Sequence, residues 1–189
     1  MTGTAVRKLE LVALLGMPLV RSGDDLAGLI LDALAAADRA LEAGDVLVLA
    51  QKIVSKAEGR TADLAEVTPS PRARKLAAQC HKDARLVELI LSESTEVLGQ
   101  RPEVLVVVHR SGVVLANAGI DASNVGGDGG TERVLLLPED ADATCRPLCQ
   151  TLHARTGVEV AVIVNDSLGR AWRNGTVGVA LGASGLAAL

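Results

Sequence analysis

Three short apolar runs constrain the fold of this chain more than any other feature. They are DVLVLA at residues 45–50, EVLVVVH at 103–109 and EVAVIV at 159–164. Apolar runs of this length, rich in Val and Ile, predict strands that lie buried in a sheet. Because the chain has one Trp and no Tyr or Phe, its core must be built from Leu, Val, Ile and Ala.

Stretches with helical spacing precede or separate these strands, at residues 26–41, 72–79, 83–95 and 141–155. Arg110, Ser111 and Gly112 lie between two apolar segments and predict a hairpin, which argues against a purely parallel sheet. We therefore predict a mixed α/β (α+β) fold, with one domain over residues 1–189. We also expect a further strand at 9–15, a loop at 51–60 and the end of the last apolar strand at residue 164.

Composition excludes several classes of protein. The net charge is -4, with 19 Lys+Arg against 23 Asp+Glu, so bulk electrostatic binding to nucleic acid or to an anionic membrane is not expected. No stretch is apolar for the about 18 residues that a membrane-spanning helix needs. Three cysteines without a CxxC pattern favour free thiols, and hence a cytoplasmic protein.

Polar residues that follow the apolar strands are the candidates for chemistry. Lys56, after the first strand, could contact a phosphate, although a solvated loop with ordinary lysines explains it as well. Asp121 could bind Mg²⁺ or Mn²⁺, and Asn124 a ribose or phosphate oxygen; an Asx-turn is the alternative. Asp166 and Ser167 together suit a metal that also binds phosphate, or else a helix cap. Asp121 and Asp166 together strengthen the metal-site interpretation, because a metal needs ligands from separate segments.

The whole pattern resembles the coenzyme F420-0:L-glutamate ligase (γ-glutamyl ligase) family. The resemblance rests on GDVLVLAQKIVSKAEGR, NAGIDASNV, LLLPEDADA and VNDSLGRAWRNG, and it runs in order from about residue 9 to residue 189. It implies the family's fold, in which helices flank mixed sheets, and an intertwined homodimer. It also implies that the family domain continues beyond the position of Leu189, so we expect a C-terminally truncated ligase domain without the flavin domain that some members carry.

The family's activity implies a ligase that uses GTP to add L-glutamate to the terminal carboxylate of the phospholactyl tail of coenzyme F420-0. Further γ-linked glutamates follow, through an acyl phosphate, with Mg²⁺ or Mn²⁺ required and K⁺ stimulating. Carried over by position, Asp121, Asp166 and Ser167 resemble the metal ligands, and the two aspartates are the catalytic candidates. The residues that resemble GTP contacts are Met17, Pro18, Leu19, Val20, Gln51, Lys52, Lys56 and Asn124.

Two other interpretations stay open. The chain could be an inactive paralogue that binds nucleotide or dimerises without ligating, or an unrelated metal-dependent phosphate-ester enzyme that uses the same two aspartates.

Overall fold

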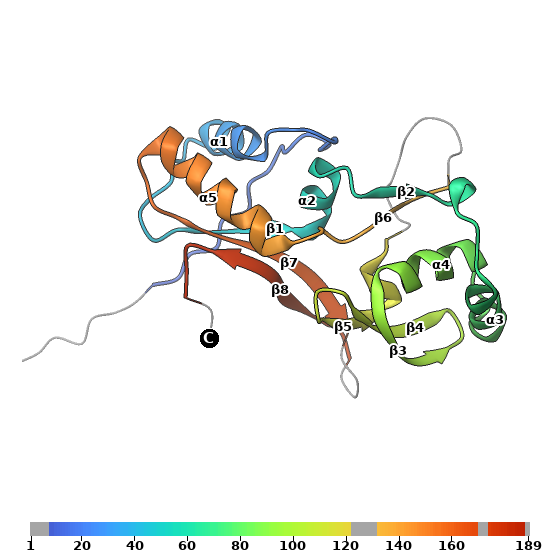
Figure 1. Cartoon of the computed structure of the whole chain (residues 1–189). Coiled ribbons are helices and arrows are strands. Elements are labelled where there is room, and N and C mark those ends of the chain that lie inside the picture. Colours follow the sequence, from blue (N-terminus) through green and yellow to red (C-terminus); the bar gives the residue numbers. More distant parts are fainter. Residues whose placement is uncertain (1–7, 122–131, 170–173, 188–189) are drawn as a thin grey trace, which may run out of the picture.

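The computed structural model describes residues 8–121, 132–169 and 174–187. Its helices are α1 (Leu26–Ala36), α2 (Gln51–Ala57), α3 (Pro71–Cys80), α4 (Ala84–Ser92) and α5 (Ala141–Thr156), with short 3₁₀ turns η1 (Leu64–Glu66) and η2 (Asn117–Gly119). Its strands are β1 (Val46–Ala50), β2 (Thr61–Asp63), β3 (Ser94–Arg101), β4 (Val104–His109), β5 (Val114–Ala116), β6 (Arg133–Leu135), β7 (Ala161–Gly169) and β8 (Thr176–Ser184). The mixed α/β prediction is confirmed, and Figure 1 shows two lobes.

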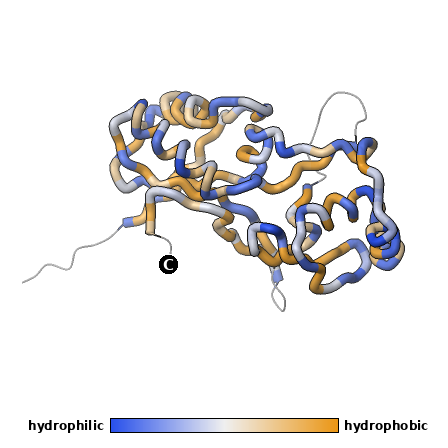
Figure 2. The backbone as a smooth tube through the Cα atoms, viewed as in Figure 1, coloured by the Kyte–Doolittle hydropathy of each residue, from blue (hydrophilic) through white to orange (hydrophobic). Residues whose placement is uncertain are grey.

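The first lobe is a three-stranded sheet in the order β1-β7-β8, covered on one face by α1 and α5 (Figure 1). β1 runs parallel to β7, with Ala50 opposite Asn165, and β8 runs antiparallel to β7. Ile30, Leu152 and Val162 are almost fully buried between helices and sheet. The apolar strands predict this core because their Leu and Val side chains can leave water only against the helices. Figure 2 shows apolar stretches of the tube within this lobe.

β8 passes so close to the start of α5 that residue 182 must be glycine. A Cβ atom on Gly182 would lie 2.4 Å from the carbonyl carbon of Ala141 and 2.5 Å from the amide nitrogen of Asp142. We expect Gly182→Ala to lower the free energy of unfolding by about 1–3 kcal/mol, the usual cost of overpacking. Gly99→Ala is the matched control, because a Cβ there meets nothing within 4 Å. Urea denaturation of both variants measures the difference; equal stabilities would contradict the close approach.

The second lobe is an antiparallel sheet in the order β3-β4-β5, with α3 and α4 on one face (Figure 1). Leu105 and Val107 are fully buried and pack with Val87 and Ile90 of α4. Alternate residues of β4 point to the opposite face of the sheet. The predicted hairpin at 110–112 is confirmed, since the backbone N–H of Gly112 donates to the carbonyl of His109 over 2.8 Å.

In the part of the chain that the structure describes, packed strand ends and a two-stranded ribbon both join the lobes. The ends of β7 and β8 reach β5, where Leu168 packs with Leu115 and Leu137. The two-stranded ribbon of β2 and β6 forms the second connection, which runs from α2 toward α4 in Figure 1.

The strand predicted at residues 9–15 is wrong. This segment has no regular structure, and Leu9, Leu11 and Leu15 are 84%, 89% and 82% exposed. A strand needs a neighbour for its backbone, and residues 8–20 make no backbone hydrogen bond with another described residue.

The loop predicted at 51–60 is also wrong in its first part, which is α2. Gln51, Val54 and Ser55 are buried at the i, i+3 and i+4 spacing of a helix face. The helix ends before Gly59, whose φ of +69° suits the turn that follows.

The strand expected to end at residue 164 continues to Gly169, so Asn165, Asp166 and Ser167 lie within β7. It continues because β8 pairs with it along this stretch, with Asp166 opposite Val179. The sequence does not predict a strand at residues 176–184, because Gly and Ala interrupt the apolar pattern there.

Candidate active site

A cavity of about 1280 Å³ lies between the two lobes. The start of α2, the end of β7 and the segment 119–121 form one end of its lining, and the strands β3, β4 and β5 form the other. Five of the sequence-predicted residues line the first end: Gln51, Lys52, Asp121, Asp166 and Ser167. The two aspartates, which are far apart in the sequence, therefore share one cavity.

Asp121 is held by its backbone and by its side chain. Its N–H donates to the carbonyl of Leu135 over 2.9 Å, and its own carbonyl accepts from the N–H of Leu135 over 2.8 Å. Its carboxylate forms an ion pair with the ammonium group of Lys52, from the first turn of α2. Because both the backbone and the charge are fixed, the carboxylate enters the cavity at a defined place.

Asp166 reaches the same end of the cavity from β7. Burial raises the pKa of this carboxyl above its ordinary value; the negative charge of Asp121 acts in the same direction, while the N–H of Ser167 and the charge of Lys52 oppose it. Its Oδ1 accepts the hydrogen bond from the N–H of Ser167 over 2.8 Å. The folded chain thus places two carboxylates close enough to repel each other.

These residues fit a divalent cation such as Mg²⁺ or Mn²⁺. A cation of this kind prefers carboxylate and hydroxyl oxygens, and Asp121, Asp166 and Ser167 offer both at one end of the cavity. The mutual repulsion of the carboxylates is relieved by positive charge placed between them. Among the described residues, no group of three or more His, Cys, Asp or Glu suits a metal, so remaining coordination positions would fall to water or phosphate oxygens.

The other predicted nucleotide contacts lie elsewhere or outside the described residues. Lys56 is one turn after Lys52 on α2 and is half-buried, but it does not line the cavity. The Oε1 atom of Gln51 accepts a hydrogen bond from the Ser55 hydroxyl over 2.9 Å, which fixes the side chain.

The N-terminal candidates do not line the cavity either. Met17 is half-buried, Pro18 and Leu19 are exposed, and Val20 is buried in the core of the first lobe. Asn124 lies outside the described residues. The structure therefore brings together the metal candidates and two nucleotide candidates, Gln51 and Lys52, at one end of the cavity.

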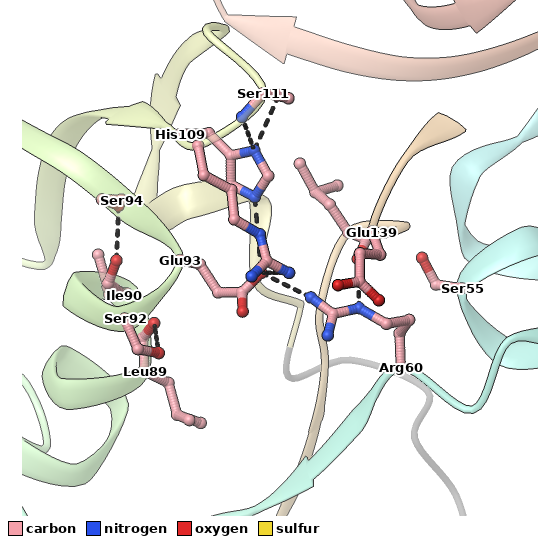
Figure 3. A network of polar contacts seen from close by, with 12 residues as sticks. Ser55, Arg60, Leu89, Ile90, Ser92, Glu93, Ser94, His109, Ser111 and Glu139 are labelled. Atoms are coloured by element: carbon pink, nitrogen blue, oxygen red, sulfur yellow. Dashed lines mark hydrogen bonds and ion pairs between the residues drawn. The ribbon is translucent and has the colours of Figure 1, made fainter. Parts of the chain in front are cut away.

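A network of charged side chains around the buried Glu93 links the two lobes (Figure 3). The Oε2 atom of Glu93, at the end of α4, lies 2.6 Å from Nη2 of Arg60 and 3.1 Å from Nη2 of Arg110. The Nε atom of Arg60 also donates to the carbonyl of Leu137 over 3.0 Å. Arg60 follows α2 and Glu93 belongs to the second lobe, so the network ties the site-bearing helix to the opposite lobe.

The environment of Glu93 favours its charged form. Burial alone would raise the pKa of this carboxyl, but the His109 ring and the charges of Arg60 and Arg110 outweigh burial and hold the pKa below its ordinary value. The N–H of Ser111 donates to Nδ1 of His109 over 3.1 Å, so in the neutral ring the proton sits on Nε2, which faces Glu93 at 3.6 Å.

The arrangement agrees with a comparison with known proteins. The family model described as F420-0:Gamma-glutamyl ligase matches residues 15–189. The chain belongs to this family. A relative named Coenzyme F420:L-glutamate ligase from Methanothermobacter thermautotrophicus is 46% identical over 178 residues, which cover 94% of this chain and 69% of the relative.

Other members of the F420-0:gamma-glutamyl ligase family agree. A protein of the same name from Methanopyrus kandleri is 46% identical over 90% of this chain and 64% of its own length, and one from Archaeoglobus fulgidus is 43% identical over 96% and 69%. The chain therefore spans about two thirds of the length of these relatives. In the part that the structure describes, no helix has the length and apolar character needed to cross a bilayer.

Sequence reasoning missed the other end of the cavity. Gly99, Arg101, Val104 and Val106 line it from β3 and β4. The segment 94–101 has no apolar run that marks it as a strand, and Arg101 stands beside Pro102 and Glu103 in what the sequence alone indicates to be an ordinary turn.

Proposed function

We propose that this chain is a ligase that adds L-glutamate to the terminal carboxylate of coenzyme F420-0, with GTP as the energy source. The proposal rests most directly on the convergence of Asp121, Asp166 and Lys52 at one end of the cavity. Family membership supports the substrates, because the relatives are named for coenzyme F420 and L-glutamate. The phosphate-ester enzyme has no such support.

The proposed chemistry consists of two transfers. The acceptor carboxylate attacks the γ-phosphorus of GTP, the bond from that phosphorus to the bridging oxygen breaks, and GDP leaves. The glutamate amine then attacks the acyl carbon and a C–N bond forms. The C–O bond to phosphate breaks, inorganic phosphate leaves, and the proton of the amine passes to solvent. Phosphoryl transfer of this kind needs chiefly correct positions and positive charge around the phosphates.

This chain's residues would supply those requirements as follows. Asp121, Asp166 and Ser167 would hold Mg²⁺ or Mn²⁺, which when bound neutralises phosphate charge. Lys52 lies at the same end of the cavity and adds a second positive charge. Gln51, Lys56, Asn124 and the segment 17–20 are proposed nucleotide contacts. K⁺ stimulation, the homodimer and the cytoplasmic location stay predictions.

A ligation assay tests the proposal. The 189-residue chain is incubated with F420-0, L-glutamate, GTP and Mn²⁺, and the product is analysed by mass spectrometry. We expect F420-0 to gain the mass of glutamyl residues, and GTP consumption to require both glutamate and F420-0. Nucleotide binding without any mass gain would favour the inactive paralogue, and GTP hydrolysis that ignores glutamate would favour a phosphate-ester enzyme.

A further inference from the structure

The end of the cavity formed by β3, β4 and β5 has a surface suited to a flat, apolar molecule. Val104 and Val106 point away from the helices, because the alternate residues Leu105 and Val107 are fully buried on the side of α3 and α4. Gly99 is paired with Val106 and shares its face of the sheet, as does Ala116 of β5. All four residues line the cavity.

Gly99 leaves this surface open. A Cβ atom built on Gly99 meets nothing within 4 Å, and the residue does not have a positive φ. No backbone constraint therefore requires glycine here, although glycine weakens a strand. Val114, at the β5 edge of the same surface, remains 48% exposed. The result is a shallow apolar floor, which we call the β3–β5 floor, of Gly99, Val104, Val106, Val114 and Ala116.

Arg101 stands at the edge of the β3–β5 floor. It pairs with Val104 in the sheet and so projects to the cavity side. The planar guanidinium suits the oxygens of a phosphate, and in the described parts of the chain it has no ion-pair partner. η2 lies on the far side of β4 from β3, so two strand spacings, roughly 10 Å, separate β3 from η2. Asp121 follows η2 in the chain after one further residue.

We propose that the β3–β5 floor binds the planar deazaflavin of F420-0 and that Arg101 binds the phosphate of its phospholactyl tail. The proposal rests on the proposed function and adds the place of the acceptor within the same cavity. With its phosphate at Arg101, the tail points its terminal carboxylate toward Asp121 and Asp166. L-Glutamate has only two methylene groups to place on the floor and no planar ring, and the proposed nucleotide contacts on α2 lie at the opposite end.

Direct binding tests the inference without turnover. F420-0 is titrated with the chain in the absence of GTP and glutamate, and the anisotropy of its deazaflavin fluorescence is followed. We expect Arg101→Gln to weaken binding by about tenfold or more, as for the loss of a charged hydrogen bond. Gly99→Leu should weaken binding to a similar extent by filling the floor. Arg72→Gln, at an exposed arginine of α3, is the matched control and should bind like the wild type.

A deazaflavin without the phospholactyl tail separates the two contacts. Arg101→Gln should not change its affinity, whereas Gly99→Leu should weaken it. GTP affinity should stay within about twofold in both variants. The inference is overturned if the wild type does not bind F420-0, if both variants bind it normally, or if Arg101→Gln weakens binding of GTP or glutamate instead. A chain that binds F420-0 as described but never glutamylates it would overturn the ligase proposal alone.

Discussion

Asp166→Asn will abolish glutamate ligation and at the same time make the folded chain harder to unfold. Activity is lost because the amide cannot share a divalent cation with Asp121, and we expect kcat to fall by at least about 100-fold. Stability rises because the carboxyl has a higher pKa in the folded chain than in water, mainly through burial and then through the charge of Asp121. Such a group destabilises the folded state wherever it is ionised.

The stability gained by Asp166→Asn is expected to depend on pH. Above the ordinary pKa of Asp, 3.8, the charged Asp166 destabilises the fold, so the variant gains stability at neutral pH and loses its advantage as the pH falls toward that value. Urea denaturation at several pH values, with no metal present, measures the gain. Asp32→Asn, at an exposed position on α1, controls for the loss of a surface charge. A variant that is inactive and also less stable at neutral pH would contradict the account.

The second large effect is expected at Glu93. Replacing it with Leu leaves Arg60 and Arg110 without the carboxylate that they share, and truncating one partner of a buried ion pair destabilises proteins strongly. We expect the free energy of unfolding to fall by about 3 kcal/mol. Activity measured well below the melting temperature should fall too, because Arg60 directly follows the helix that carries Lys52.

Glu93→Gln tests the electrostatic part of this effect. The pKa of Glu93 is lowered in the folded chain, since the His109 ring and the two arginines outweigh burial. Its stabilisation is therefore complete above the ordinary value of 4.5 and disappears as the pH falls through the lower folded value. The stability gap between wild type and variant should close in acid. Glu96→Gln, exposed on β3, should show no gap; a Glu93 gap independent of pH would argue against the ion pairs.

Sequence patterns predict elements well where local composition and tertiary packing agree. The strands predicted at 45–50 and 103–109 and the helix predicted at 141–155 are confirmed as β1, β4 and α5, because their side chains fill the two cores. The pattern fails at residues 9–15, where an apolar run has no strand beside it. It also fails at β8. Gly and Ala interrupt the apolar pattern of this segment, which forms a strand through its pairing with β7.

The residues of the candidate site, too, could be predicted from the sequence only in part. Asp121 and Asp166 stand out in the sequence because they are carboxylates close to apolar strands, and the structure brings them to one cavity. Arg101 could not be found, because its importance depends on the sheet face that it shares with Val104. Glu93 was missed for a similar reason, since its two arginines come from distant segments.

The central claim is that Asp121 and Asp166 hold one divalent cation beside the nucleotide phosphates. Crystals grown with Mn²⁺ and GDP would test it directly through the anomalous scattering of manganese. The account predicts a single strong peak within ligand distance of carboxylate oxygens of both aspartates and of a GDP phosphate. A manganese peak bound by only one aspartate, or GDP phosphates bound away from both, would contradict it.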